Sequence, residues 1–521
     1  MIDTIAVLDF GSQYAQLIVR RIRDAKVYAA MFPWDAPQEK VMAENPKGFV
    51  LSGGPGSVYV PDAPRIPDYV LESGLPILGI CYGMHALTKV LGGKVSSAAK
   101  REYGSMNLVL VKPSLLLKES DAPQVWMSHG DRIDRLPEGF SILAKTSNSP
   151  VAAMGDESRG YYGLQFHPEV NHTRSGDLII RRFIRDVCGC QPEWTPESII
   201  ERSVTEIRSK IGSARVLSAV SGGVDSSVAT ALVYKAVGER LSAVFIDTGL
   251  MRENEGFWVE EVFGKNLNCN FMKINSENEF YSRLKGVTDP EEKRRIIGET
   301  FIRIFEDTAH KLDDPKFLVQ GTIYPDVIES RAPERSYANR IKTHHNVGGL
   351  PEEMDFELVE PLRYLFKDEV RMVGEALGLP KEMIWRQPFP GPGLAVRCLG
   401  EINKTRIDKL RQADAIFTEE LALGNLLKFN EDLDGTAVGT AQAFAVLLPI
   451  KAVGVMGDKR TYQEVIALRA VTTHDFMTAD WAHLPHDLLA RVSNRIVNEV
   501  EGVNRVVYDI TSKPPGTIEW E

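Results

Sequence analysis

A glycine- and serine-rich stretch between two apolar runs limits the folds that this chain can adopt. Its residues are Ser221, Gly222, Gly223, Val224, Asp225, Ser226 and Ser227. Residues 215–220 before it are β-branched and aliphatic, as in a buried parallel strand, and residues 228–237 after it carry apolar side chains at helical spacing. The pattern predicts a strand, a tight turn and a helix, which together are the unit of an α/β fold.

The predicted turn has the chemistry of an anion-binding site. Gly222 and Gly223 can take backbone angles closed to other residues, which lets a ligand approach the main chain. The helix that follows presents unpaired N–H groups and the positive end of its dipole, and the serine hydroxyls add donors. The phosphates of a nucleotide fit such a turn best. An ordinary glycine–serine turn is the alternative, and the position of Asp225 inside the turn favours phosphate.

The turn lacks the lysine of the GxxxxGK[ST] loop and is therefore a different motif. It resembles the pyrophosphate loop of the N-type ATP pyrophosphatases. The resemblance implies that residues 221–227 bind ATP, that ATP is cleaved between its α and β phosphates, and that the substrate takes AMP. It also implies a Mg²⁺ ion with Asp225 as a ligand. The motif indicates the reaction type and leaves the substrate open.

Composition limits the class of protein. The 521 residues are enough for roughly two to four domains, and the hydrophobic content of 43% is ordinary for a globular protein. The formal net charge of -10 argues against bulk binding of nucleic acid. No apolar run has membrane-spanning length, and the N-terminus lacks the pattern of a secretory signal. We therefore expect no nucleic-acid or membrane partner.

The cysteines are too few and too scattered for a disulfide framework, which predicts a reducing cytoplasm. They are Cys81, Cys188, Cys190, Cys269 and Cys398. Cys188 and Cys190 are closer together than zinc-site spacing, so a metal there is only a minor alternative.

The first segment contains a candidate nucleophile. Residues 5–9, 48–52 and 76–80 read as strands, and residues 13–24 read as a helix. The third of these strands breaks at Gly79–Gly83, and a helix through Val90 follows. This is the pattern of a nucleophile elbow with the sulfur of Cys81 in place of oxygen. The start of a helix favours thiolate, but a base is still expected.

The sequence offers a base and a partner for it further along the chain. His167 and Glu169 flank a proline that fixes the local backbone. His167 can take the thiol proton, and Glu169 can orient the imidazole. Taken singly, Cys81 is more often a buried small hydrophobe and His167 a satisfied polar residue. The elbow and the HPE run together favour the catalytic interpretation.

The segments LSGGPGSV, GICYGMH and QFHPEV closely resemble the class I glutamine amidotransferase domain over roughly the first 190 residues. The resemblance implies that Cys81 is the nucleophile, His167 the base and Glu169 the orienting residue. It also implies an oxyanion hole formed by backbone N–H groups near Gly54 and Tyr82.

The chain departs from that family at His85, where the elbow usually continues to a glutamine that helps to seat the substrate. The affinity for glutamine is therefore an open question. Residues 126–131 match a substrate-side loop of the same family, with a plain polar turn at residues 128–131 as the alternative.

The middle segment follows a boundary with two prolines at residues 191–196. After a helix at residues 197–210, apolar runs at 215–220, 243–247, 271–274 and 317–321 alternate with helical stretches, which predicts a doubly wound parallel sheet. Asp247 and Asp326 follow two of these runs, where ligands bind such sheets. They either meet ribose or metal, or cap turns.

Basic residues in this segment are candidate phosphate ligands. Lys293, Arg294 and Arg295 open a helix, although a solvated helix face is the commoner cause of such a run. Further donors, in a glycine-rich loop, are Lys342, His344 and His345. Lys367 stands at a predicted helix start, where a cation is unfavourable, which hints at a phosphate partner.

The last segment begins after a proline- and glycine-rich linker at residues 387–393. Predicted helices at 404–421 and 487–500 and an apolar run at 444–450 indicate a small α+β unit. The tail, KPPGTIEWE, looks tied down rather than frayed.

The order of these parts, with the PFPGPGL linker and the KPPGTIEW tail, is similar from end to end to the family of glutamine-hydrolysing GMP synthases. The resemblance implies an amidotransferase domain at 1–193, an ATP pyrophosphatase domain at 194–396, and a dimerisation and XMP-binding domain at 397–521. It implies that XMP is adenylated at its C2 oxygen and that ammonia displaces AMP. The family's XMP contacts fall on Arg294, Gln442, Asp458, Arg505, Lys513, Ile518 and Glu519.

The implied partners are thus XMP, ATP and glutamine, with a homodimer through the C-terminal domain. Two alternatives stay open. One is another glutamine-dependent amidation by ATP pyrophosphatase chemistry. The other is a nucleotide-binding regulator with an inert glutaminase half.

Overall fold

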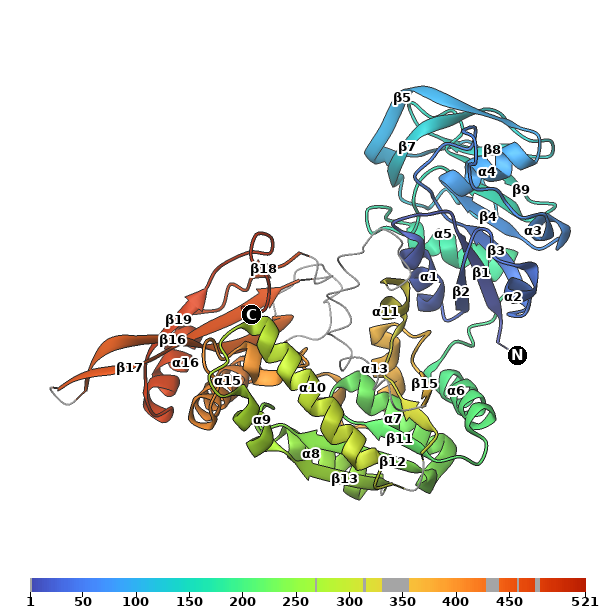
Figure 1. Cartoon of the computed structure of the whole chain (residues 1–521). Helices are drawn as coiled ribbons and strands as arrows, with labels where there is room; N and C mark the ends of the chain where they lie inside the picture. Colours follow the sequence, from blue (N-terminus) through green and yellow to red (C-terminus); the bar gives the residue numbers. More distant parts are fainter. Residues whose placement is uncertain are drawn as a thin grey trace. The chain divides into compact units, whose positions relative to one another are not determined.

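The chain forms two compact units, Met1–Ile199 and Ile200–Glu521, in a computed structural model (Figure 1). The structure describes residues 2–267, 269–312, 315–329, 356–427, 440–456, 459–473 and 478–521. Lys342, His344, His345 and Asp458 lie outside the described residues. The expected segments 194–396 and 397–521 both fall largely in the second unit, so their division into two domains stays a prediction.

The first unit is built on an eight-stranded mixed sheet with the order β2-β1-β3-β4-β10-β9-β8-β6. The strands are β1 (Thr4–Asp9), β2 (Tyr28–Pro33), β3 (Pro46–Leu51), β4 (Ile77–Ile80), β6 (Val109–Leu110), β8 (Ser141–Lys145), β9 (Ala153–Asp156) and β10 (Tyr161–Leu164). The strands from β2 to β10 in this order are parallel, and the rest are antiparallel. All four residues of β4 are buried, as expected for a central strand that is covered on both faces.

Helices and a separate ribbon complete this unit. The helices are α1 (Ala15–Asp24), α2 (Gln38–Met42), α3 (Asp68–Glu72), α4 (Tyr82–Val90) and α5 (Gly176–Arg182). The long strands β5 (Lys94–Asn107) and β7 (Gln124–Arg135) pair antiparallel as a two-stranded sheet. The chain passes into the second unit within α6 (Pro196–Ile211).

The second unit contains a five-stranded parallel sheet with the order β13-β12-β11-β14-β15. Its strands are β11 (Val216–Ala219), β12 (Leu241–Asp247), β13 (Asn270–Asn275), β14 (Phe317–Val319) and β15 (Glu357–Val359). The chain steps outward from β11 to β13 and then returns to the other side of β11 with β14. This reversal confirms the predicted doubly wound α/β sheet, in which ligands bind at the carboxyl ends of the strands beside the switch point.

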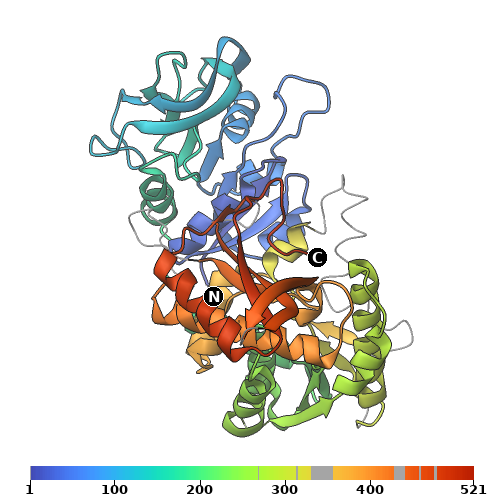
Figure 2. The ribbon, with the colours of Figure 1, turned by 90° about the vertical axis from the view of Figure 1, so that its left-hand side faces the viewer.

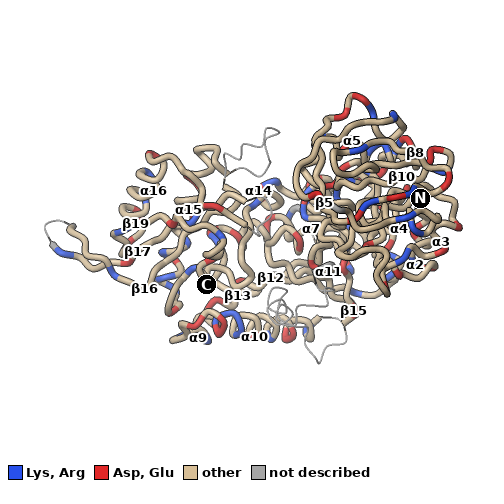
Figure 3. Tube along the Cα trace, turned by 90° about the horizontal axis from the view of Figure 1, so that it is seen from above, with Lys and Arg blue, Asp and Glu red and all other residues tan. Residues whose placement is uncertain are grey.

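The helices of this sheet are α7 (Val224–Val237), α8 (Glu255–Glu260), α9 (Glu277–Leu284), α10 (Pro290–Ala309), α11 (Tyr324–Glu329), α13 (Lys367–Ala376) and α14 (Lys381–Ile384). Basic and acidic residues lie close together along α10 (Figure 3), where Arg295 pairs with both Glu292 and Glu299. No helix among the described residues is long and apolar enough to cross a bilayer.

The C-terminal part of this unit is a mixed sheet covered by two helices. The sheet contains β16 (Gln442–Met456), β17 (Lys459–Thr472), β18 (Asp480–Trp481) and β19 (Val503–Asp509). Helices α15 (Lys404–Leu423) and α16 (His486–Glu499) pack on each other and on this sheet (Figures 1 and 2). One hydrophobic cluster runs from Leu217 of the parallel sheet to Phe417 and Ile466. That shared core explains why both parts form one compact unit.

Candidate functional sites

Cys81 occupies a strained turn between β4 and α4. Its backbone has φ 51° and ψ -103°, which is unfavourable for a residue with a side chain. A Cβ at Gly79 would lie 2.6 Å from the backbone of Gly83, and a Cβ at Gly83 would lie 2.3 Å from the Leu51 carbonyl oxygen. Glycine is therefore required on both sides of the elbow, as the sequence pattern predicts.

His167 and Glu169 lie beside this elbow in the geometry of a triad. Nδ1 of His167 is 2.7 Å from Oε1 of Glu169, and the Glu169 side chain is fully buried. The ring of Tyr14 contacts His167 edge-on at 5.2 Å. A Cβ at Gly53 would lie 3.4 Å from Cε1 of His167, so the imidazole fits closely against the backbone after β3.

The surroundings of His167 favour its charged form. Burial by itself lowers the pKa, but hydrogen bonds with Cys81 and Glu169 outweigh it and raise the pKa of His167 to about 10. At neutral pH the ring is an imidazolium next to the sulfur. A cation in that position stabilises a thiolate and can later give its proton to a leaving amine.

The predicted oxyanion donors lie at the same place. Tyr82 is the first residue of α4, so its N–H has no partner within the helix. A Cβ at Gly54 would lie 3.1 Å from the Tyr82 ring and 2.8 Å from the Phe10 carbonyl oxygen, so only glycine fits there.

Two further residues lie near Cys81, Ser128 from the expected substrate-side segment and Gln165 from the QFHPEV segment. The Cys81 thiol donates to the carbonyl oxygen of Ser128 at 3.7 Å, and Nε2 of Gln165 is 4.0 Å from the sulfur. The loop conformation expected at residues 126–131 is wrong, because these residues lie inside β7, paired with β5, although Ser128 does lie beside Cys81. The alternation of buried Met127 and His129 with a half-buried Ser128 is the period of a strand.

The second site is the turn between β11 and α7. Gly222 has φ +76°, and the hydroxyls of Ser221 and Ser226 are 3.0 Å apart across the turn. Gly223 caps α7 without a side-chain hydrogen bond, so the first N–H groups of the helix stay open to an anion. The hydroxyl of Ser227 is buried, and no hydrogen-bond partner for it is found among the described residues.

Asp225 has one oxygen paired and one unpaired. Its Oδ2 pairs with Nζ of Lys367, while the buried Oδ1 has no hydrogen-bond partner among the described residues. The negative charge of Asp225 offsets the unfavourable position of the Lys367 cation at the start of α13. A phosphate partner for Lys367 stays a prediction. An unsatisfied carboxylate oxygen beside a phosphate loop fits Mg²⁺, which prefers one or two carboxylates together with substrate phosphates. The described residues contain no group of three or more His, Cys, Asp or Glu side chains that could hold a metal by themselves.

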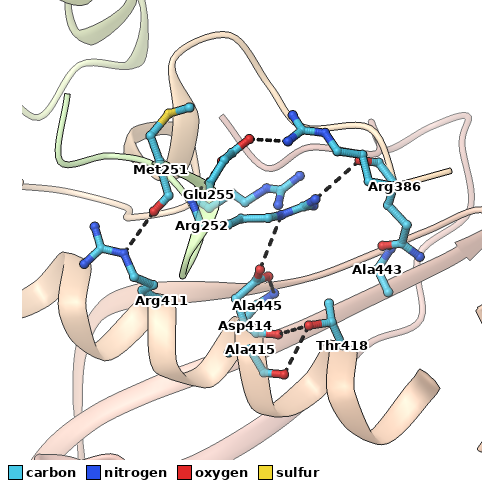
Figure 4. Close-up of polar contacts among 12 residues, drawn as sticks. Met251, Arg252, Glu255, Arg386, Arg411, Asp414, Ala415, Thr418, Ala443 and Ala445 are labelled. Carbon is cyan, nitrogen blue, oxygen red and sulfur yellow. Dashed lines mark hydrogen bonds and ion pairs between the residues drawn. The ribbon is translucent and has the colours of Figure 1, made fainter. Parts of the chain in front are cut away.

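A cluster of ion pairs packs against this loop, and its members are drawn in Figure 4. A Cβ at Gly222 would lie 3.1 Å from Oε1 of Glu255, which shows that this carboxylate packs against the turn. Glu255 pairs with Arg386, and Arg252 lies 3.6 Å from Asp414 of α15. The cluster thus ties the phosphate loop to the linker and to the C-terminal helices.

The tail is held by buried cations, which confirms that it is tied down. Arg397 donates two hydrogen bonds to Glu519, at 3.0 and 2.7 Å, and its guanidinium lies 4.0 Å from the Phe444 ring. Gln442 also donates to Glu519, at 2.9 Å. Lys293, which is fully buried, pairs with Glu521 at 2.5 Å.

The predicted XMP residues are only partly brought together. Gln442 and Glu519 are in direct contact, and Ile518 is buried in a cluster with Phe444. Arg294 pairs with Glu291 of its own helix, and Arg505 is exposed on β19. The backbone of Lys513 pairs with Ala479. The sequence pattern did not single out Arg397 or the role of Lys293.

Asp247 and Asp326 act as turn caps in this structure. Oδ1 of Asp247 accepts from the N–H of Gly249 at 3.1 Å, and Oδ2 of Asp326 accepts from the N–H of Ile323 at 3.2 Å. Of the two alternatives for these residues, the observed contacts favour capping.

Comparisons with known proteins agree across the whole chain. The family described as Glutamine amidotransferase class-I matches residues 6–187, and the GMP synthase C terminal domain matches residues 432–520. A GMP synthase (glutamine-hydrolyzing) of Thermomicrobium roseum is 56% identical over 100% of this chain and 97% of its own length. One of Methylobacillus flagellatus is 53% identical over 100% of both chains. The solved structure of a glutamine amidotransferase from Thermotoga maritima covers 36% of this chain and 99% of its own, with 18% identity and a TM-score of 0.30.

Proposed function

Since the chain belongs to the family of glutamine-hydrolysing GMP synthases, we propose that it makes GMP from XMP, ATP and glutamine. The first unit releases ammonia from glutamine, and the second activates XMP with ATP and releases AMP and pyrophosphate. The observation that carries the proposal is a complete Cys–His–Glu arrangement and an SGGVDSS phosphate loop in one chain that matches these relatives from end to end.

The glutaminase half uses the elbow. The Cys81 sulfur attacks the amide carbon of glutamine, and the backbone N–H groups near Gly54 and Tyr82 stabilise the oxyanion. The C–N bond then breaks as the His167 imidazolium gives its proton to the departing ammonia. Water, activated by the neutral imidazole, hydrolyses the thioester to glutamate. Glu169, 2.7 Å from Nδ1 of His167, holds the ring in place throughout.

The synthetase half uses the phosphate loop. The C2 oxygen of XMP attacks the α-phosphorus of ATP, and pyrophosphate leaves into the N–H groups at the start of α7. Ammonia then adds at C2, and AMP leaves in place of a poor oxygen leaving group. Asp225 would hold Mg²⁺, which supplies neutralisation of phosphate charge when bound. The residues proposed to contact XMP are Arg294, Gln442, Asp458, Arg505, Lys513, Ile518 and Glu519.

We also propose a homodimer through the C-terminal sheet. Val453, Val455 and Tyr462 are 53%, 73% and 60% exposed on β16 and β17, and the register pairs Val453 with Tyr462 on one face. Exposed apolar side chains in a row suit a second copy of the chain.

The test uses purified protein and Cys81→Ala. With XMP, ATP, Mg²⁺ and glutamine, mass spectrometry should detect GMP, AMP and glutamate. The variant should lose glutamine-dependent GMP by roughly 1000-fold or more and keep ammonia-dependent GMP, because the synthetase site lies in the other unit. Equal loss with both nitrogen sources would contradict the assignment of Cys81.

The same assay separates the alternatives. An amidated product other than GMP would identify another glutamine-dependent ligase. Nucleotide binding without turnover, and without glutamate release, would identify a regulator with an inert glutaminase half.

A further inference from the structure

His85 and Gln165 form a buried polar chain that ends at the candidate nucleophile. Nε2 of His85 lies 2.7 Å from Oε1 of Gln165, and Nε2 of Gln165 lies 4.0 Å from Sγ of Cys81. His85 is 3% exposed and Gln165 is fully buried. The two residues are 80 positions apart in the sequence, so their contact is made only by the fold.

We propose that Gln165 is a positioning residue for Cys81, and that His85 keeps its amide N–H group directed at the sulfur. The inference rests on the proposed glutaminase function and concerns the same site. It explains why position 85 can hold a histidine, because this side chain donates a hydrogen bond to Gln165 and does not need to bind the substrate.

The two contacts of Gln165 define the direction of its amide, since Oε1 faces His85 and Nε2 faces Cys81. Burial lowers the pKa of His85 to about 4, although the hydrogen bond with Gln165 opposes this, so the ring is neutral at pH 7. A neutral ring can donate or accept at Nε2, and the amide oxygen of Gln165 opposite it selects the tautomer with the proton on Nε2. The amide NH₂ must then face the other way, toward Cys81.

The contact with sulfur gains strength when Cys81 ionises. The separation of 4.0 Å between Nε2 of Gln165 and Sγ of Cys81 is long for a hydrogen bond, and a thiol is a weak acceptor. A thiolate accepts more strongly, and catalytic hydrogen bonds commonly shorten only in the reacting complex. Gln165 therefore supplies a neutral donor to the sulfur, in addition to the charged donor, His167.

Gln165→Glu tests the polarity of the donor with almost no change in shape. The variant directs a carboxylate oxygen at the sulfur, so we expect alkylation of Cys81 by iodoacetamide at pH 7 to slow by about tenfold or more. Peptide mass spectrometry identifies the modified cysteine, and Cys81→Ala gives the background. Gln38→Glu, an exposed substitution in α2, is the matched control and should alkylate at the wild-type rate. An unchanged alkylation rate in folded Gln165→Glu, checked by its unfolding temperature, would overturn the proposal.

His85 variants separate positioning from substrate binding. His85→Leu removes the donor to Gln165 and should lower kcat of glutamine hydrolysis by about tenfold with little change in KM. His85→Gln restores an N–H donor and should recover most of kcat. A rise in KM with unchanged kcat would show that His85 seats glutamine and would overturn the inference, while wild-type protein without glutaminase activity would instead refute the proposed function.

Discussion

Two buried histidines near Cys81 titrate in opposite directions because their partners differ. Hydrogen bonds with Cys81 and the carboxylate of Glu169 outweigh burial and raise the pKa of His167 to about 10. His85 faces a neutral amide, so burial dominates and lowers its pKa to about 4. Environments that push two titratable groups apart in this way assign their roles: His167 carries a proton for chemistry, and His85 is a neutral donor.

The depressed pKa of His85 makes the first unit sensitive to acid. Above about pH 6.5 the ring is neutral in both folded and unfolded chains. As the pH falls toward 4, the unfolded chain gains a proton that the folded site resists, so stability is lost. His85→Gln removes the titrating histidine. Between pH 7 and pH 4, the free energy of unfolding of the variant should therefore fall by about 3 kcal/mol less than the free energy of unfolding of the wild type. Urea unfolding of both proteins at several pH values measures the difference, and parallel curves would contradict it.

At the scale of elements, local sequence pattern identified some apolar elements but missed others, such as the fully buried strand β10. The strand predicted at 215–220 is β11 (Val216–Ala219), and the helix predicted at 404–421 is α15 (Lys404–Leu423). The long strands β5 and β7 were missed because they carry mostly polar side chains and lie outside the main sheet. A hydrophobic period cannot reveal a strand of that kind.

Some residues of the candidate sites could likewise be predicted from local sequence, and others could not. Cys81 and Ser221–Ser227 lie in local motifs. Close backbone contacts explain Gly79 and Gly83, and a positive φ explains Gly222. The pairs His85–Gln165 and Arg397–Glu519 span 80 and 122 residues, and nothing in the local sequence links their members. Such contacts follow only from the tertiary fold.

The elbow itself can be tested with Gly83→Ala. The added Cβ would lie 2.3 Å from the Leu51 carbonyl oxygen, so β3 and α4 must separate. We expect the first unit to lose roughly 1–3 kcal/mol of stability and most of its glutaminase activity. Gly56→Ala is the matched control for stability, because no atom lies within 4 Å of its Cβ position. Calorimetry compares the two variants, and equal unfolding temperatures would show that the elbow tolerates the methyl group.

At the scale of the whole molecule, the two candidate sites lie in different units, and the C-terminal sheet offers a surface for assembly. The strands β16 and β17 extend past the helices α15 and α16 (Figure 1). Val453, Val455 and Tyr462 on these strands are more than half exposed. A surface of this kind would be covered twice in a symmetric dimer, because each copy contributes the same patch.

Val455→Asp should therefore weaken the dimer strongly. Each copy would lose the burial of one valine, about 1.5–3 kcal/mol, and would place a carboxylate in the interface. Because a symmetric dimer contains the substitution in both copies, we expect the dissociation constant to rise by roughly 100-fold or more. Leu423→Asp is the matched control, since Leu423 is 75% exposed at the end of α15, against 73% for Val455. Sedimentation velocity at micromolar concentration should show dimers for the wild type and Leu423→Asp, and monomers for Val455→Asp. A wild type that sediments as a monomer, or a Val455→Asp variant that stays dimeric, would place the dimer interface elsewhere or remove it.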